Sequence, residues 1–170
     1  ALNWQPAAIA PVALAFGLWL TGGLHLDGLM DTADGLAAGN DRCLEAMDDS
    51  RVGASGAQAL VIVLLLQFSA LVQLGGLAPA ALVTSAFFAR VSPLWAMGRF
   101  RYLRRDGTAA FHRSNWCGWR EGLPALLLVV VTALLLFWLQ PERLADFAGG
   151  VLLGTLSALL PAEWLGRHLG

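Results

Sequence analysis

Long apolar runs are the feature that most limits what this chain can fold into. Five runs are each close to the roughly 20 residues that a helix needs to cross a bilayer. They cover residues 6–25, 57–77, 78–98, 122–140 and 144–165. Only 14% of the 170 residues are charged, against about 25% in soluble domains. We therefore predict an all-α, polytopic membrane protein: one integral-membrane domain over residues 1–170, with about five transmembrane helices, belonging to a longer bundle.

Turns and charge set the expected topology. Pro79 divides the long middle run into a helical hairpin, and Pro141 divides the last pair of runs. Pairing the spans in this way puts the polar segments 26–56 and 99–121 on one face of the membrane. Among the basic residues, the opposite turns carry only Arg143. The positive-inside rule then assigns the polar face to the cytoplasm, and we expect the inner (plasma) membrane of a prokaryote.

Three aspartates follow the first apolar run. Asp27, Asp31 and Asp34 are spaced i, i+4, i+7, so a helix would place them within about 60° of one another. Carboxylates gathered beside hydrocarbon repel one another and are costly to desolvate, and a divalent cation would offset that cost. The spacing therefore predicts a metal site and, through it, phosphate chemistry. The alternative interpretation is a capped helix end at the membrane interface.

Residues around this stripe are candidates for binding substrate. Gly28 and Gly35 each follow an aspartate and would let a phosphate or metal approach the backbone, with helix packing as the alternative. His25 precedes the stripe, and we favour support of the aspartates over catalysis. Ser50 is a candidate cap for the helix that follows. Arg51, beside a glycine-rich stretch, is a candidate anion ligand at that helix's N-terminus.

Every base in the chain is arginine, whose planar fork suits phosphate. Arg90 lies inside the third run, where a charge is expensive unless it is paired or faces a polar cavity. We predict that it is a counter-ion to the aspartates or a phosphate ligand, with snorkelling as the alternative. Arg99, Arg101, Arg104 and Arg105 form a juxtamembrane cluster, for which substrate contact competes with a role in topology or lipid binding. The acidic and basic segments would share the cytoplasmic surface.

Several motifs resemble the adenosylcobinamide-GDP ribazoletransferase (cobalamin synthase) family. The family's hallmark is a glycine-rich lead-in followed by HLDGL-x-DT-x-DG, which matches residues 22–35. An acidic helix that ends in D-S-R-x-G matches residues 45–53. An arginine in a span before an arginine-rich loop matches Arg90 and residues 99–105. The resemblance covers essentially the whole chain.

The resemblance implies a Mg²⁺-dependent membrane transferase of late cobalamin (vitamin B12) biosynthesis. Such an enzyme joins adenosylcobinamide-GDP to α-ribazole or its 5′-phosphate and releases GMP. It implies an in-line displacement in which Asp27, Asp31 and Asp34 bind the metal, or one of them acts as base. Arg51 and Arg90 would neutralise the transferring phosphoryl group. The candidate substrate-binding residues are His25, Gly28, Gly35, Ser50, Arg99 and Arg101.

Further expectations concern partners and completeness. Apolar walls near Trp95, Phe100 and Trp116 are candidate contacts for the bulky corrinoid. Family members carry additional N-terminal sequence and a late glycine-aspartate motif, so we expect this chain to be a fragment. Cys43 and Cys117 lack a metal-binding spacing and should be free thiols. We expect no nucleic-acid partner, and we leave self-association into a homo-oligomer open.

Two other functions are alternatives. A CDP-alcohol phosphotransferase also combines aspartates with Mg²⁺, and its signature includes a D-G-x2-A-R element. Residues 34–38 of this chain resemble that element but lack the arginine, and the later aspartate spacing of that signature is absent. A cation transporter would distribute its carboxylates at mid-membrane over several spans. Here the acids gather at one membrane boundary, which favours an enzyme.

Overall fold

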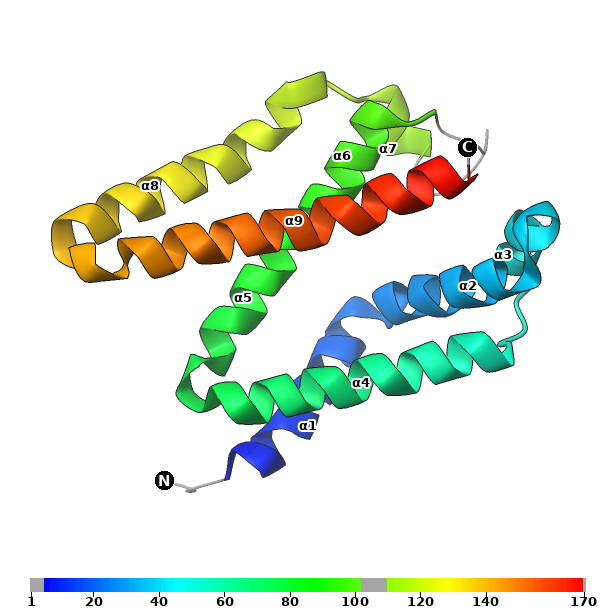
Figure 1. Cartoon of the computed structure of the whole chain (residues 1–170), viewed down its shortest axis with the longest axis horizontal. Helices are drawn as coiled ribbons and strands as arrows, with labels where there is room; N and C mark the ends of the chain where they lie inside the picture. Colours follow the sequence, from blue (N-terminus) through cyan, green and yellow to red (C-terminus); the bar gives the residue numbers. More distant parts are fainter. Residues whose placement is uncertain (1–4, 102–109, 170) are drawn as a thin grey trace. The chain divides into compact units, whose positions relative to one another are not determined.

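All regular secondary structure that the structure describes is helical, which confirms the predicted fold class (Figure 1). The structure is a computed structural model and describes residues 5–101 and 110–169. The chain divides into two compact units, Ala1–Ala81 and Leu82–Gly170.

The first unit opens with a sharply bent pair of helices. The axes of α1 (Pro6–Thr21) and α2 (Leu24–Ala38) differ in direction by 88°. Between them Gly22 and Gly23 have φ angles of 62° and 73°, a left-handed conformation that glycine adopts without strain. The first apolar run therefore ends with α1, and the acidic motif begins a new helix with a new direction.

The acidic helix α2 packs along the long apolar helix that follows it in the chain. After α2 come the short helices η1 (Asn40–Arg42) and α3 (Cys43–Asp48), then α4 (Ala54–Leu74) and η2 (Gly75–Leu77). Both α1 and α2 pack against α4, and α3 packs against α2 (Figure 1). Much of the segment expected to lie outside the spans, residues 26–56, is therefore a helix held beside α4.

The second unit contains the remaining helices. They are α5 (Ala78–Phe88, which begins at the end of the first unit), α6 (Val91–Arg99), α7 (Ala110–Ser114), η3 (Gly118–Gly122), α8 (Leu123–Leu139), η4 (Pro141–Arg143) and α9 (Leu144–Leu169). The helices α8 and α9 form an antiparallel hairpin through η4 (Figure 1). α6 packs against α9, and η3 contacts both α6 and α8.

The apolar run over residues 78–98 is two helices instead of the single span that we expected. α5 ends at Phe88 and α6 begins at Val91. Pro93 lacks the N–H that would bond to the Ala89 carbonyl in a continuous helix, and its ring would clash with that carbonyl. The break therefore falls at residues 89–90, and Arg90 lies at a helix junction.

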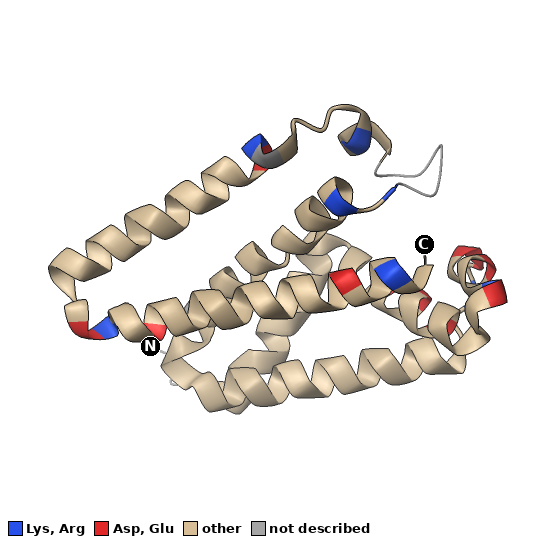
Figure 2. Ribbon diagram, turned by 45° about the horizontal axis from the view of Figure 1, so that its top comes forward, with Lys and Arg blue, Asp and Glu red and all other residues tan. Residues whose placement is uncertain are grey.

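Three described helical segments are long and apolar enough to cross a membrane: Ala54–Leu77, Arg120–Leu139 and Pro141–Leu169. The bent pair α1 and α2 adds a fourth if it is counted as one broken span. α4 and α8 carry no charged residue along their length (Figure 2). Their large apolar side chains are largely exposed, as lipid-facing side chains are, and Trp138 is 79% exposed. These helices indicate a multi-pass membrane protein, and residues 5–101 and 110–169 provide three to four candidate spans beside the approximate five that we expected.

Candidate functional site

The three aspartates lie on α2, so the prediction that they share a helix is confirmed. Asp27 is exposed, whereas Asp31 and Asp34 are half-buried. Within residues 5–101 and 110–169, no three His, Cys, Asp or Glu side chains converge closely enough to hold a metal ion. The stripe is therefore no closed three-carboxylate cage in this conformation, and the metal stays a prediction.

Asp34 caps a helix that lies far from it in sequence. One carboxylate oxygen accepts the Gly53 N–H and the other accepts the Gly56 N–H, both at 2.8 Å. Gly53 is the residue that precedes α4, and Gly56 lies in its first turn. These N–H groups have no partner within their own helix, and the N-terminal end of a helix attracts negative charge. Asp34 thus satisfies two donors at the end of α4 and fastens α2 to it.

The two glycines leave room for that carboxylate. A Cβ atom on Gly53 would clash with one Asp34 oxygen, and a Cβ on Gly56 would clash with the other. The Cβ on Gly56 would also lie 3.0 Å from the Met30 carbonyl oxygen. The anion expected at the N-terminus of this helix is therefore supplied by the chain itself.

Of the other candidate residues near the three aspartates, some pack against neighbouring side chains and others lie in open surroundings. Gly35 is buried, and a Cβ there would lie 2.7 Å from the Met47 side chain, which favours the packing interpretation. A Cβ placed on Gly28 would have nothing within 4 Å, so its surroundings are open. His25 is exposed in the first turn of α2. Ser50 was expected as a cap, but α4 begins four residues later and takes its cap from Asp34.

Arg51 forms a bidentate ion pair with Asp49. Its Nε and Nη2 atoms donate to the carboxylate at distances from 2.6 to 3.1 Å, and its backbone N–H donates at 3.0 Å. The side-chain hydrogen bonds from Arg51 lower the pKa of Asp49 from 3.8 to about 2, and the same bonds raise the pKa of Arg51. A phosphate bound by Arg51 would therefore share this guanidinium with Asp49 or displace the carboxylate.

The remaining candidate arginines lie in the second unit. Arg90 lies at the junction of α5 and α6, and its backbone N–H donates to the Phe87 carbonyl at 3.0 Å. Arg99 ends α6, with its guanidinium 5.4 Å from the centre of the Phe100 ring. Arg101 is exposed. Arg104 and Arg105 lie outside the described residues.

Sequence reasoning missed Glu163, which joins α9 to α6. Its carboxylate accepts hydrogen bonds from Trp95 Nε1 at 3.2 Å and from Arg167 Nε at 2.8 Å. Arg99 lies 3.6 Å from one of its oxygens. The signal was present: a glutamate inside an apolar run with an arginine four residues later is a favourable helical pair.

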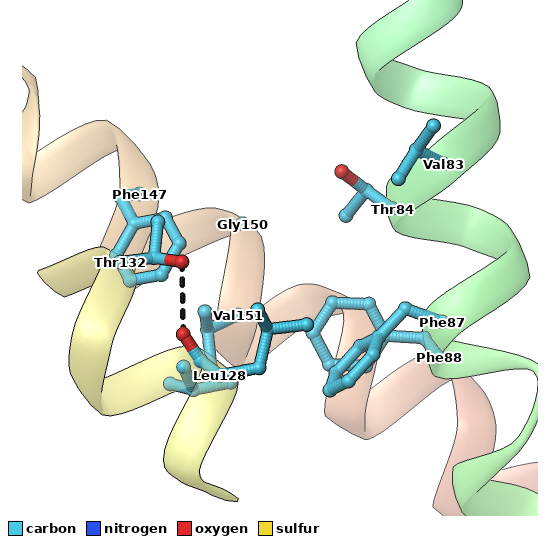
Figure 3. A pocket seen from close by; sticks show the side chains of 10 residues that line it. Val83, Thr84, Phe87, Phe88, Leu128, Thr132, Phe147, Gly150 and Val151 are labelled. Atoms are coloured by element: carbon cyan, nitrogen blue, oxygen red, sulfur yellow. Dashed lines mark hydrogen bonds between the residues drawn. The ribbon is translucent and has the colours of Figure 1, made fainter. Parts of the chain in front are cut away.

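Among the pockets in the described part of the second unit, two are relevant to the predicted contacts. The first has a volume of about 580 Å³, and Trp95, Arg99 and Trp116 are among its lining residues. Two of the three predicted corrinoid contacts thus share one pocket, whereas Phe100 packs against α9 near Gly166. The second, about 430 Å³, is apolar and lies between α5, α8 and α9 (Figure 3). Its Thr132 hydroxyl donates to the carbonyl of Leu128 on the same helix.

The two cysteines differ in their exposure. Cys43 is buried and Cys117 is exposed, and both are free thiols. That part of the prediction is confirmed.

Comparison with known proteins gives a consistent family. The model of the family described as cobalamin-5-phosphate synthase matches residues 1–170. An adenosylcobinamide-GDP ribazoletransferase of Prochlorococcus marinus (strain MIT 9303) is 55% identical over 174 residues, covering 99% of this chain. Relatives with the same name from a second Prochlorococcus marinus strain, SARG, and from Trichormus variabilis are 43% and 38% identical, over 99% and 93% of this chain.

The chain spans 66% of the length of the Prochlorococcus marinus MIT 9303 protein, 67% of the SARG protein and 64% of the Trichormus protein. No solved structure matches the chain.

Proposed function

This chain belongs to the cobalamin-5-phosphate synthase family, and from that membership we propose that it takes part in the transfer for which its relatives are named. In that reaction the adenosylcobinamide-phosphate moiety of adenosylcobinamide-GDP passes to α-ribazole or α-ribazole 5′-phosphate, and GMP leaves. The observation that carries the proposal is the match over the whole chain, with the acidic sequence on one ordered helix. Membership of this family also argues against the CDP-alcohol phosphotransferase and the cation transporter.

We propose Mg²⁺ as the cofactor, held by Asp27 and Asp31. These residues stand one turn apart on α2, and Mg²⁺ is usually bound by one or two carboxylates together with substrate phosphates. This arrangement does not need the three-ligand cage that the described residues lack. When bound, the ion would neutralise charge on the diphosphate. A metal role for Asp34 stays a prediction, since each of its oxygens already accepts a backbone N–H.

The protein's own residues would supply positioning and charge. Asp34 holds α2 against α4 and so fixes the direction in which Asp27 and Asp31 are presented. Arg51 would bind phosphoryl oxygens through its planar fork, in exchange for Asp49. Arg90 stays a predicted phosphate ligand. Either exposed Asp27 or half-buried Asp31 is a candidate base for the attacking ribazole hydroxyl.

We propose the bacterial inner membrane as the location, with the acidic helix reached from the cytoplasm. The support is the arginine-rich side of the expected topology. Adenosylcobinamide-GDP and α-ribazole or its phosphate would then be drawn from the cytoplasm.

GMP release from adenosylcobinamide-GDP tests the proposal. We expect the full chain, reconstituted in lipid, to release GMP in the presence of Mg²⁺ and an α-ribazole acceptor. Asp31→Asn should reduce the rate of GMP release by at least about 100-fold, since it removes one of the two carboxylates proposed to hold Mg²⁺ at the reacting phosphates. Near-normal release by this variant would remove the role proposed for Asp31.

Asp146→Asn is the matched control. Asp146 is exposed in the first turn of α9, away from the acidic stripe in sequence and in a different unit. The substitution is the same change from carboxylate to amide, and we expect the variant to release GMP at a rate within about twofold of the unchanged chain. An equal loss in both variants would mean that the loss reflects damage to the fold or to membrane insertion.

A further inference from the structure

The pocket beside α6 is lined by Trp95, Trp116 and Arg99, which are among the substrate contacts that we predicted, so an inference about its ligand rests on the proposed function. Two tryptophans line it, Trp95 from α6 and Trp116 from the loop before η3, and Arg99 adds a cation. Its volume, about 580 Å³, is within the range of about 300–1,000 Å³ that is usual for small-molecule sites. Most of its lining is apolar, including Val91 and Leu94. The combination fits a ligand with one flat apolar part and one anionic part.

The Trp95 ring is held in position by the chain. Its Nε1–H donates to Glu163 at 3.2 Å, so the polar edge of the indole is satisfied by α9. Glu163 is itself held by Arg167 at 2.8 Å, and its side chain is only 22% exposed. Trp116, in the loop between α7 and η3, lies 3.5 Å from the position that a Cβ on Gly98 would take. The Trp95 wall is thus held in place before a ligand arrives, which lowers the cost of binding.

The charge around Arg99 favours an anion. Arg99 and Arg167 provide two positive charges, and Glu163 provides one negative charge, so this cluster has a net charge of +1. Arg167 is the closer partner of Glu163, at 2.8 Å, whereas Arg99 lies at 3.6 Å. The Arg99 side chain is 51% exposed. Its donors are therefore available to a phosphate without breaking the bond between Arg167 and Glu163.

From this arrangement we propose that the pocket binds a nucleoside monophosphate, with its base against Trp95 and Trp116 and its phosphate on Arg99. Stacking on aromatic side chains accepts any flat base, and a guanidinium binds phosphate in a bidentate manner. A lipid headgroup would offer the same phosphate at a membrane interface. The pair of tryptophans is what favours a ligand with a base, and the site lies in a different unit from the acidic helix.

Equilibrium binding of radiolabelled GMP tests this proposal. The full chain would be placed in nanodiscs of zwitterionic lipid and titrated with GMP and, separately, with guanosine. We expect saturable binding of GMP and weaker binding of guanosine. Trp116→Ala should weaken both by about 5- to 100-fold through loss of stacking. Trp116→Phe should restore most of the affinity, which separates stacking from misfolding.

The phosphate contact has its own variant. Arg99→Gln should lower GMP affinity to that of guanosine and leave guanosine binding unchanged. Trp164→Ala and Arg143→Gln are matched controls, because neither residue lines the pocket, and both should bind like the unchanged chain. Absence of saturable GMP binding, or equal binding by the unchanged chain and by Trp116→Ala, would overturn the proposal.

A second arm separates the two sources of phosphate. Nanodiscs that contain phosphatidylglycerol should leave GMP binding within about twofold of its value in zwitterionic lipid. Loss of GMP binding there, together with no binding of guanosine anywhere, would assign the pocket to a lipid headgroup and overturn the nucleotide proposal. GMP release measured on the same samples keeps the two proposals apart. GMP release without pocket-dependent GMP binding would overturn only the proposal for the pocket. Pocket-dependent GMP binding without GMP release would overturn only the proposed transferase function.

Discussion

Asp34 places its two carboxylate oxygens on the backbone of another helix, at 2.8 Å each. From the sequence it was indistinguishable from Asp27 and Asp31, because a spacing of i, i+4, i+7 shows only that residues share a face. The alternative interpretation of the stripe, a capped helix end, describes the Asp34 bonds correctly. The pattern could not show that the capped helix begins 20 residues further on, since that depends on how α2 folds back.

Replacing Asp34 tests the cap. Asp34→Ala leaves two N–H groups at the start of α4 without their acceptor and should lower the free energy of unfolding by about 1–2 kcal/mol. Amide hydrogen exchange at Gly53 and Gly56 should accelerate, and thermal unfolding in detergent should begin at a lower temperature. Asp27→Ala, on the exposed part of the same helix, should leave both amides protected. Unchanged exchange in Asp34→Ala would contradict the cap.

The Asp49–Arg51 pair gives a prediction for pH. Because the folded-state pKa of Asp49 is lowered from 3.8 to about 2, the ion pair contributes to stability above pH 3.8 and is lost as pH falls toward 2. A carbon-13 titration of the Asp49 carboxyl should therefore have its midpoint near 2. In Arg51→Gln the midpoint should return toward 3.8. The same midpoint in both chains would mean that Arg51 does not set this pKa.

At the scale of helices, the sequence predicted where helices occur better than where they are interrupted. Each apolar run is helical, but helix-breaking residues interrupted the helices at two places. Two consecutive glycines turned α2 by 88° from α1, and Pro93 separated α6 from α5. Hydropathy gives no direction for a helix after a turn, so the packing of the acidic helix on α4 could not be predicted from composition.

Close packing of α2 on α4 depends on a missing side chain. Gly56→Ala would place a Cβ in collision with an Asp34 oxygen and 3.0 Å from the Met30 carbonyl, so the cap must move or the helices must separate. We expect the chain to be destabilised by about 1–3 kcal/mol, measured by thermal unfolding.

Gly149→Ala supplies the comparison, because that helical glycine has nothing within 4 Å of the new atom. There we expect stabilisation by about 0.5–1 kcal/mol, since alanine has the higher helix propensity. If both variants moved the unfolding temperature in the same direction, the contact between α2 and α4 would not control the effect of Gly56→Ala.

For the whole molecule, the expected topology makes the polar segments cytoplasmic. Each membrane crossing reverses the side of the chain, and the arginines lie mostly in two segments. The expected topology counts residues 78–98, the broken pair α5 and α6, as one crossing between those segments. In cysteine-free chains that carry single replacements, Ser50→Cys and Asn115→Cys should react with a membrane-impermeant thiol reagent from the cytoplasmic side. Arg143→Cys, in the turn between α8 and α9, should react from the opposite side. Labelling of Ser50→Cys and Arg143→Cys from the same side would refute the topology.

The central claim is that the carboxylates of α2 serve a magnesium-dependent release of GMP. The most direct measurement is the rate of GMP release by Asp27→Asn as Mg²⁺ is titrated, beside the unchanged chain. Removing one of two metal-binding carboxylates should raise the Mg²⁺ concentration for half-maximal rate by at least about 10-fold. A Mg²⁺ dependence identical to that of the unchanged chain would contradict the claim.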